Sequence, residues 1–203
     1  MSIKSWALLA VYLALLGIVA WPLGAWLARL SSGQLPNWMR RTERLLFSLA
    51  GTSSDHSMSW SQYALAVLAF NAIGVFVVYG MQRLQTWLPL NPAGMAPVSP
   101  HSAFNTAISF VTNTNWQGYA GESTMSYLTQ MLALTVQNYF SAATGIAVAF
   151  ALIRGFAAQS TRVVGNFWVD VTRIIAWLLM PLSVLLAVFL VGQGVIQNFD
   201  PYR

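Results

Sequence analysis

The chain has 203 residues, 57% of them hydrophobic and only 7% charged, whereas a soluble domain has roughly a quarter charged residues, so this composition excludes an ordinary soluble domain and indicates a membrane protein. The absence of cysteine excludes disulfides, thiolate chemistry and cysteine-based metal sites. The ten Lys and Arg residues outnumber the five Asp and Glu residues, but they are scattered and do not form the basic stripe of a nucleic-acid-binding protein.

Four apolar segments are long enough to cross a hydrocarbon layer about 30 Å thick, which takes about 20 helical residues. The first covers residues 5–27. Because Lys4 precedes it, this segment resembles a signal peptide, but it is too long and lacks a convincing cleavage site. We therefore predict an uncleaved transmembrane helix within residues 1–30. The other three spans are residues 63–87, 127–153 and 173–195.

Basic residues beside the spans predict how the chain is oriented. Most of the arginines lie in or beside two connections, residues 31–61 and residues 156–172. By the positive-inside rule, both connections are predicted to face the cytoplasm, so that both termini and the stretch between the second and third spans face outside. The arginines concerned are Arg29, Arg40, Arg41, Arg44, Arg154, Arg162 and Arg173.

The stretch between the second and third spans is too long for a tight turn and contains the sequence SPHSAFNTAISFVTN. Pro100 and Ser102 indicate a helix start with Ser102 as the N-cap, and we predict a helix over residues 102–111. At about 1.5 Å per residue, this helix reaches roughly half-way through a membrane, so it enters the bilayer and returns. Residues 62–155 are therefore predicted to form a membrane–pore–membrane repeat similar to that of potassium channels.

The polar segment TNTNWQ follows this short helix directly. A selectivity filter points successive backbone carbonyl groups at an ion, which requires some residues with positive φ, and after glycine this conformation is tolerated best by Asn. The C-terminal end of the helix carries a partial negative charge that favours a cation. We predict a filter for a monovalent cation over residues 112–118, while an ordinary external turn remains the alternative. The candidate residues are Thr112, Asn113, Thr114, Asn115 and Gln117.

Two further groups of polar residues flank the predicted filter. On the third span, helical spacing predicts one polar face, which either lines a cavity below the filter or packs against another helix, with Ser141 and Gly145 as a close contact. Glu122 either raises the local cation concentration at the mouth or complements the N-terminus of the third span. The residues on the polar face are Gln130, Gln137, Ser141 and Thr144.

Five segments resemble a known protein family. They are WPLGAWLARL, LPLNP, NTAISFVTNTNWQGYAGESTMSYLTQM, LTVQNYFSAATGIAVAFALIRG and GNFWVDVTRI. Together they look like the potassium-binding A subunit of the Kdp potassium-transporting ATPase, and the match covers essentially the whole chain.

The resemblance implies four membrane–pore–membrane repeats in one chain, preceded by an extra N-terminal helix. It places Asn113 where other repeats carry the central glycine of the filter. Because the family's chain is far longer, we expect an N-terminal fragment that ends with the first helix of a second repeat, residues 173–203. The expected fold is an all-α integral membrane protein with four transmembrane helices, one re-entrant pore helix and a filter loop.

The resemblance also implies an ion, partners and a location. External K⁺ would bind at the filter and pass through an intramembrane tunnel to the P-type ATPase B subunit, with small C and F subunits completing a complex in the bacterial inner membrane. The sequence has no P-type phosphorylation motif and no Walker-type GKS or GKT, so we expect this chain to be non-catalytic and to bind no ATP. Two alternatives remain open: an ATPase-independent potassium channel subunit, and a structural or assembly protein whose TNTNWQ loop binds nothing.

Overall fold

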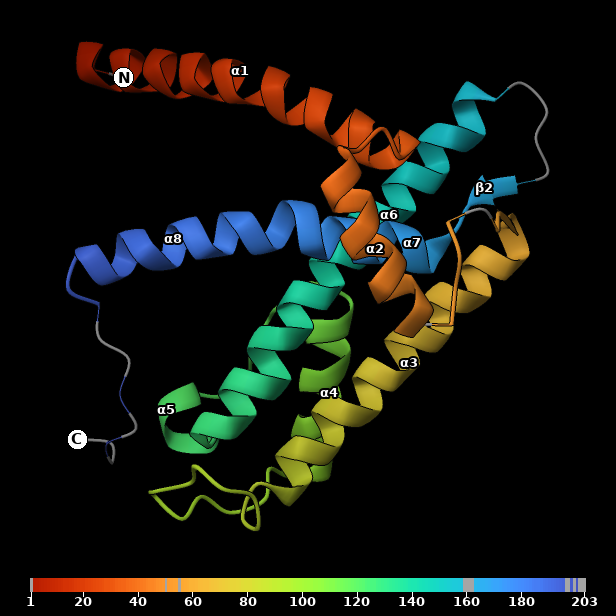
Figure 1. Cartoon of the computed structure of the whole chain (residues 1–203). Helices are drawn as coiled ribbons and strands as arrows, with labels where there is room; N and C mark the ends of the chain where they lie inside the picture. Colours follow the sequence, from red (N-terminus) through yellow and green to blue (C-terminus); the bar gives the residue numbers. More distant parts are fainter. Residues whose placement is uncertain are drawn as a thin grey trace. The chain divides into compact units, whose positions relative to one another are not determined.

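The computed structural model describes residues 2–49, 51–54, 56–158, 163–195, 198 and 200. The chain divides into two compact units, Met1–Leu46 and Phe47–Arg203. Both consist mainly of helices (Figure 1). In chain order the elements are α1 (Ile3–Ser32), α2 (Asn37–Leu49), β1 (Met58–Ser59), α3 (Trp60–Leu84), α4 (Pro100–Val111), α5 (Gly121–Thr124), the π-helix η1 (Thr129–Thr135), α6 (Val136–Ala157), β2 (Val163–Gly165), α7 (Phe167–Ile174), the π-helix η2 (Ile175–Leu179) and α8 (Met180–Gly192).

The four predicted spans are confirmed as four helices long and apolar enough to cross a membrane. They are Ile3–Ser32, Trp60–Leu84, Thr129–Ala157 and Phe167–Gly192. The fourth begins at Phe167 and not at residue 173, because the Asn166 side chain caps it by accepting a hydrogen bond from the Trp168 amide at 3.0 Å. Hydropathy placed the start of this helix too late, because its first turns contain the polar residues Asp170, Thr172 and Arg173.

The two connections predicted as cytoplasmic loops contain regular structure. Residues 31–61 include the helix α2, which hydropathy did not detect because its apolar residues are spread at helical spacing between charged ones. Residues 156–172 include β2 and the start of α7, and β2 pairs antiparallel with β1. Arg162, which contributed to the orientation prediction, lies outside the described residues.

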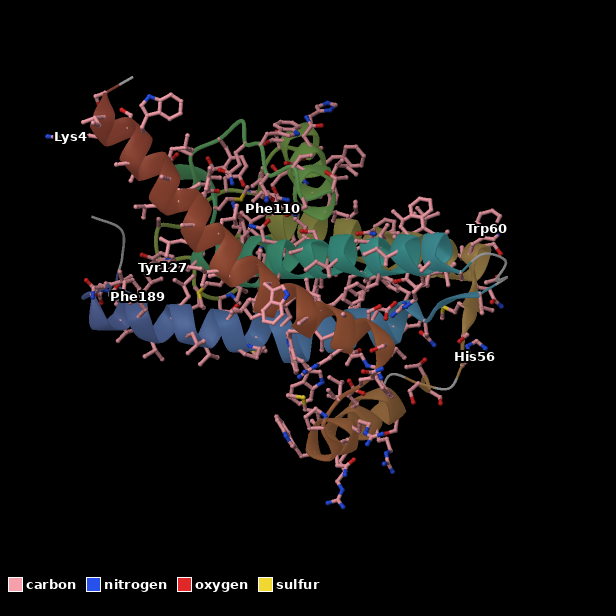
Figure 2. The ribbon with its side chains drawn as sticks, turned by 90° about the horizontal axis from the view of Figure 1, so that it is seen from above. Lys4, His56, Trp60, Phe110, Tyr127 and Phe189 are labelled. Carbon is pink, nitrogen blue, oxygen red and sulfur yellow. The ribbon has the colours of Figure 1, made fainter. Side chains whose placement is uncertain are left out.

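The larger unit is organised around α3, α4 and α6, which lie side by side (Figure 1). Ala103 and Ala107, four residues apart on α4, are both fully buried, and these small side chains let α4 approach its neighbours closely. They pack in one apolar cluster with Val78 of α3 and Leu134 of η1. Trp60, which begins α3, and Tyr127, which precedes η1, lie at opposite ends of this arrangement (Figure 2), as expected for antiparallel helices.

A partly buried ion pair joins α6 to α7 at the Trp60 end of the unit. Arg154 binds both carboxylate oxygens of Asp170, at 2.6 and 2.7 Å, and the Tyr63 hydroxyl donates to the same carboxylate at 3.0 Å. Gly165 has a φ of +107°, which favours glycine, and a Cβ atom there would displace the Arg154 guanidinium from its position against Asp170. The pair therefore links the end of the third span to the start of the fourth.

We predict that Asp170→Ala destabilises the chain, because Arg154 and Tyr63 would lose the buried carboxylate that both bind and keep the carbonyl oxygens of Val164 and Ala147 as acceptors. Breaking a buried pair costs about 3–5 kcal/mol, and partial exposure of Arg154 favours the lower end of this range. The free energy of unfolding is measured by SDS titration of the chain in mild detergent, followed by circular dichroism. Arg41→Gln, an exposed arginine of α2, is the control and is expected to have little effect. Equal stability of the two variants would contradict a stabilising role for the pair.

Candidate functional site

The candidate site begins with α4, which ends at Val111 as predicted but begins earlier than predicted. The prediction that Ser102 is the N-cap is wrong. The N-cap is Ser99, whose side-chain oxygen accepts a hydrogen bond from the Ser102 amide at 3.4 Å. Pro100 occupies the first helical position, where its missing N–H needs no partner. Six of the twelve residues of α4 are buried, and three of them, Ser109, Phe110 and Val111, form its C-terminal end, so one face and the end of the helix are enclosed by protein.

The backbone of the loop after α4 alternates in conformation. Asn113 and Asn115 have φ values of 58° and 54°, in the left-handed region, and Thr112 before them has a φ of −81°. This confirms the expectation that the asparagines adopt positive φ. Among the described non-glycine residues, only Leu90 shares this conformation. The ion-binding role of residues 112–118 remains a prediction, and these residues are exposed in this chain.

Ser109, in the last turn of α4, holds the loop against the helix end. Its carbonyl oxygen accepts hydrogen bonds from the amides of Thr114 and Asn115 at 3.0 and 3.2 Å. Its hydroxyl donates to the carbonyl oxygen of Trp116 at 3.0 Å. Ser109 is 1% exposed, so the buried half of each bond lies on the helix, whereas the loop residues are exposed. The sequence analysis missed this residue, because nothing in the local pattern distinguishes it from an ordinary helical serine.

The two threonine hydroxyls of the loop turn towards the end of α4. Thr112 donates to the Ile108 carbonyl oxygen at 2.9 Å, and Thr114 lies within 3.2 Å of the Ser109 carbonyl oxygen. The two hydroxyls are 3.1 Å apart. A hydroxyl that donates its proton to protein keeps lone pairs for a cation, so this arrangement is compatible with cation binding by the two threonine hydroxyls.

Asn113 also connects the loop to α6. Its side-chain oxygen accepts hydrogen bonds from the Ser141 hydroxyl at 3.3 Å and from the Asn115 amide group at 3.2 Å. The side chain of Asn113 thus braces the loop, in addition to permitting its backbone conformation. Gln117, the last predicted filter residue, is exposed.

The predicted polar face of the third span is interrupted by the π-helix η1. Because a π-helical turn contains more residues than an α-helical turn, the 3.6-residue spacing does not extend from Gln130 to Gln137. Gln130 donates to the carbonyl oxygens of Gly121 and Met125 at 3.3 and 3.0 Å, so it holds the preceding loop. Gln137, Ser141 and Thr144 are buried.

Gln137 supports the packing alternative for this face. An added Cβ at Gly74 of α3 would lie 2.6 Å from the Gln137 side-chain oxygen, so the two helices meet closely there. Gly145, in contrast, is exposed and has open space around it, so the expected close contact at Ser141 and Gly145 does not form within this chain. A cavity lining remains a prediction.

Glu122 lies in the first turn of α5, a helix of four residues, and is exposed. It is therefore not at the N-terminus of the third span, where Ser126 accepts a hydrogen bond from the Thr129 amide at 3.2 Å. Its proposed effect on cations at the mouth remains a prediction.

Gln85, just after α3, is a second residue that the sequence analysis missed. It is fully buried, and its amide group donates to the carbonyl oxygens of Ala96 and Thr124 at 2.6 and 2.9 Å. Its side-chain oxygen accepts from the Ser126 amide at 3.1 Å and from the Thr129 hydroxyl at 3.3 Å. One side chain therefore connects both loops that flank α4, a role that only long-range contacts reveal.

Among the described residues, four long apolar helices and a short, half-buried helix followed by an asparagine loop define a multi-pass α-helical membrane protein. Residues 10–203 match the sequence profile of KdpA, the potassium-transporting ATPase A subunit, and the chain belongs to this family. A protein of Variovorax paradoxus (strain S110), named potassium-transporting ATPase potassium-binding subunit, is 64% identical over all of this chain and 36% of its own length. A protein of Paracidovorax citrulli (strain AAC00-1) with the same name is 63% identical over all of this chain and 34% of its own length. The chain thus spans about a third of the length of these relatives.

We predict that Asn113→Ala is less stable than Asn113→Gly. Both variants lose the contact with Ser141, but only alanine brings a Cβ without a polar group into the left-handed conformation, which costs about 1 kcal/mol. Unfolding in detergent, measured by circular dichroism, compares the two variants. Asn105→Ala, at an exposed position of α4, is the control and should be nearly neutral. If alanine and glycine were equally stable at residue 113, the conformational argument would be wrong.

Proposed function

We propose that this chain supplies one quarter of a potassium selectivity filter in the potassium-binding subunit of a potassium-transporting ATPase. The observation that carries the proposal is the pair of left-handed asparagines, Asn113 and Asn115, directly after a short helix whose C-terminal end is buried. Membership of the family and the names of its relatives support potassium as the ion.

The proposed chemistry depends on backbone oxygens. Ser109 engages the amides of Thr114 and Asn115, and we infer that the carbonyl groups of residues 112–115 replace part of the water shell of K⁺. The C-terminal end of α4 adds the negative end of its dipole, and no carboxylate lies among residues 112–118. A site with partial negative charges and no fixed anion suits a monovalent cation better than a divalent one.

A single repeat does not surround an ion, so the rest of the subunit has to complete the ring. We propose that residues 62–155 form the first of four membrane–pore–membrane repeats, with residues 1–30 as an extra N-terminal helix and residues 173–203 as the start of the second repeat. In a bacterial inner membrane, the filter then opens to the outside and the arginine-rich connections face the cytoplasm.

The remaining steps of transport are proposed to take place on other chains. K⁺ passes from the filter through an intramembrane tunnel to a P-type ATPase B subunit, which hydrolyses ATP, and small C and F subunits complete the complex. In this assembly the present chain binds the ion and contributes no catalytic residue.

The proposal is tested by K⁺ binding to the complete subunit, measured by isothermal titration calorimetry. Asn113→Ala and Gln117→Ala are each expected to weaken K⁺ binding by about tenfold or more, corresponding to about 1.4 kcal/mol, and to reduce the preference for K⁺ over Na⁺. Asn105→Ala, outside the loop, should bind as the unmodified subunit does. Unchanged affinity and selectivity in both loop variants would instead favour a structural or assembly role.

A further inference from the structure

The helix α2 has three faces of different character. One face is buried and includes Glu43 and Phe47. A second face is exposed and carries Trp38, Thr42 and Leu45, at the spacing i, i+4 and i+7 that aligns residues along one side of a helix. We call this second face the α2 stripe. The third face, the arginine row, is also exposed and consists of Arg40, Arg41 and Arg44.

Two of the three side chains of the α2 stripe expose apolar surface. Trp38 is 60% exposed and Leu45 is 63% exposed. The hydroxyl of Thr42, between them, donates to the Trp38 carbonyl oxygen at 3.2 Å, which satisfies its hydrogen-bonding proton within the helix. Contact of this stripe with water is unfavourable, whereas contact with acyl chains is not.

The preceding helix places α2 at the level of the membrane surface. The 30 residues of α1 make a helix about 45 Å long, which exceeds a hydrocarbon core about 30 Å thick, so a membrane-spanning α1 brings both of its ends, including the C-terminal end with Arg29, to the headgroup regions. Gly33, with a φ of 71°, ends α1, and α2 begins at Asn37. The short connection keeps α2 close to that end of α1.

Charge and residue type identify the surface that fits α2. The arginine row outnumbers the single acidic residue of the helix, Glu43, which is buried. Trp is enriched at membrane interfaces, and Arg side chains extend along apolar surface towards headgroups. An amphipathic helix with these two faces inserts its apolar side at the boundary between headgroups and acyl chains, and anionic lipids strengthen its binding.

We propose that α2 is an interfacial helix that binds the bilayer surface, with the α2 stripe among the acyl chains and the arginine row on the phosphate groups of anionic lipids. This proposal does not depend on potassium binding. If residues 112–118 bound no potassium, the proposal for α2 would still stand. If α2 did not bind lipid, the filter proposal would still stand.

The absence of cysteine from the chain makes a site-specific test possible. A nitroxide label is attached to Thr42→Cys, in the α2 stripe, or to Ser48→Cys, an exposed position about 120° further round the helix. The full chain is reconstituted in phosphatidylcholine nanodiscs with or without phosphatidylglycerol. Electron paramagnetic resonance then compares collisions of the label with oxygen, which concentrates in lipid, and with a water-soluble nickel complex. Leu45→Cys is a second label site in the stripe if Thr42→Cys does not fold.

The proposal expects a several-fold higher oxygen-to-nickel ratio at Thr42→Cys than at Ser48→Cys. Phosphatidylglycerol should raise the ratio at Thr42→Cys, and changing Arg40, Arg41 and Arg44 together to Gln should abolish this rise. Water-like ratios at both label sites would overturn the proposal. A label at Thr42→Cys that neither reagent reaches would also overturn it, because protein and not lipid would then cover the stripe. A ratio independent of phosphatidylglycerol would overturn the role of anionic lipid.

Discussion

The buried end of α4 is the constraint on which the candidate site depends. A helix that ends inside protein leaves its last carbonyl groups without partners, and each unpaired buried group is costly. The chain resolves this at Ser109, whose carbonyl oxygen accepts hydrogen bonds from two loop amides while its hydroxyl holds the Trp116 carbonyl. Such a tight return requires the left-handed conformations of Asn113 and Asn115. The same interactions that satisfy the helix end therefore also shape the loop.

Polar contacts likewise secure both ends of α3, whereas in its middle a small residue allows close packing. Near its start, Tyr63 shares the Asp170 carboxylate with Arg154, and just beyond its end, Gln85 joins the two loops around α4. Hydrogen bonds hidden from water compete with little solvent, so a few of them position long loops. Between these ends, Gly74 lets Gln137 of α6 approach closely. This division keeps α4 in place between two helices.

Local patterns in the sequence predicted part of this organisation. Length and hydropathy were sufficient for the four spans, and the half-length helix and the positive φ of the asparagines followed from residue type. Local patterns failed where a competing feature intervened. Ser99, not Ser102, caps α4. Hydropathy did not predict α2, because charged residues lie among its apolar ones. The π-helix η1 changes the helical register that was assumed for the third span. Glu122 formed part of a separate short helix.

The sequence by itself determined the membrane class of this protein, its spans, its family and the residues whose backbone turns left-handed, because these depend on composition, periodicity and the intrinsic preferences of single residues. Only the tertiary structure decided which side chains hold the asparagine loop and the helix ends. Ser109 with Trp116, Gln85 with Ser126 and Arg154 with Asp170 are contacts across turns or between elements. Such pairings depend on how the helices pack against one another. The spacing of residues within one segment does not determine which residues of another segment lie within contact distance.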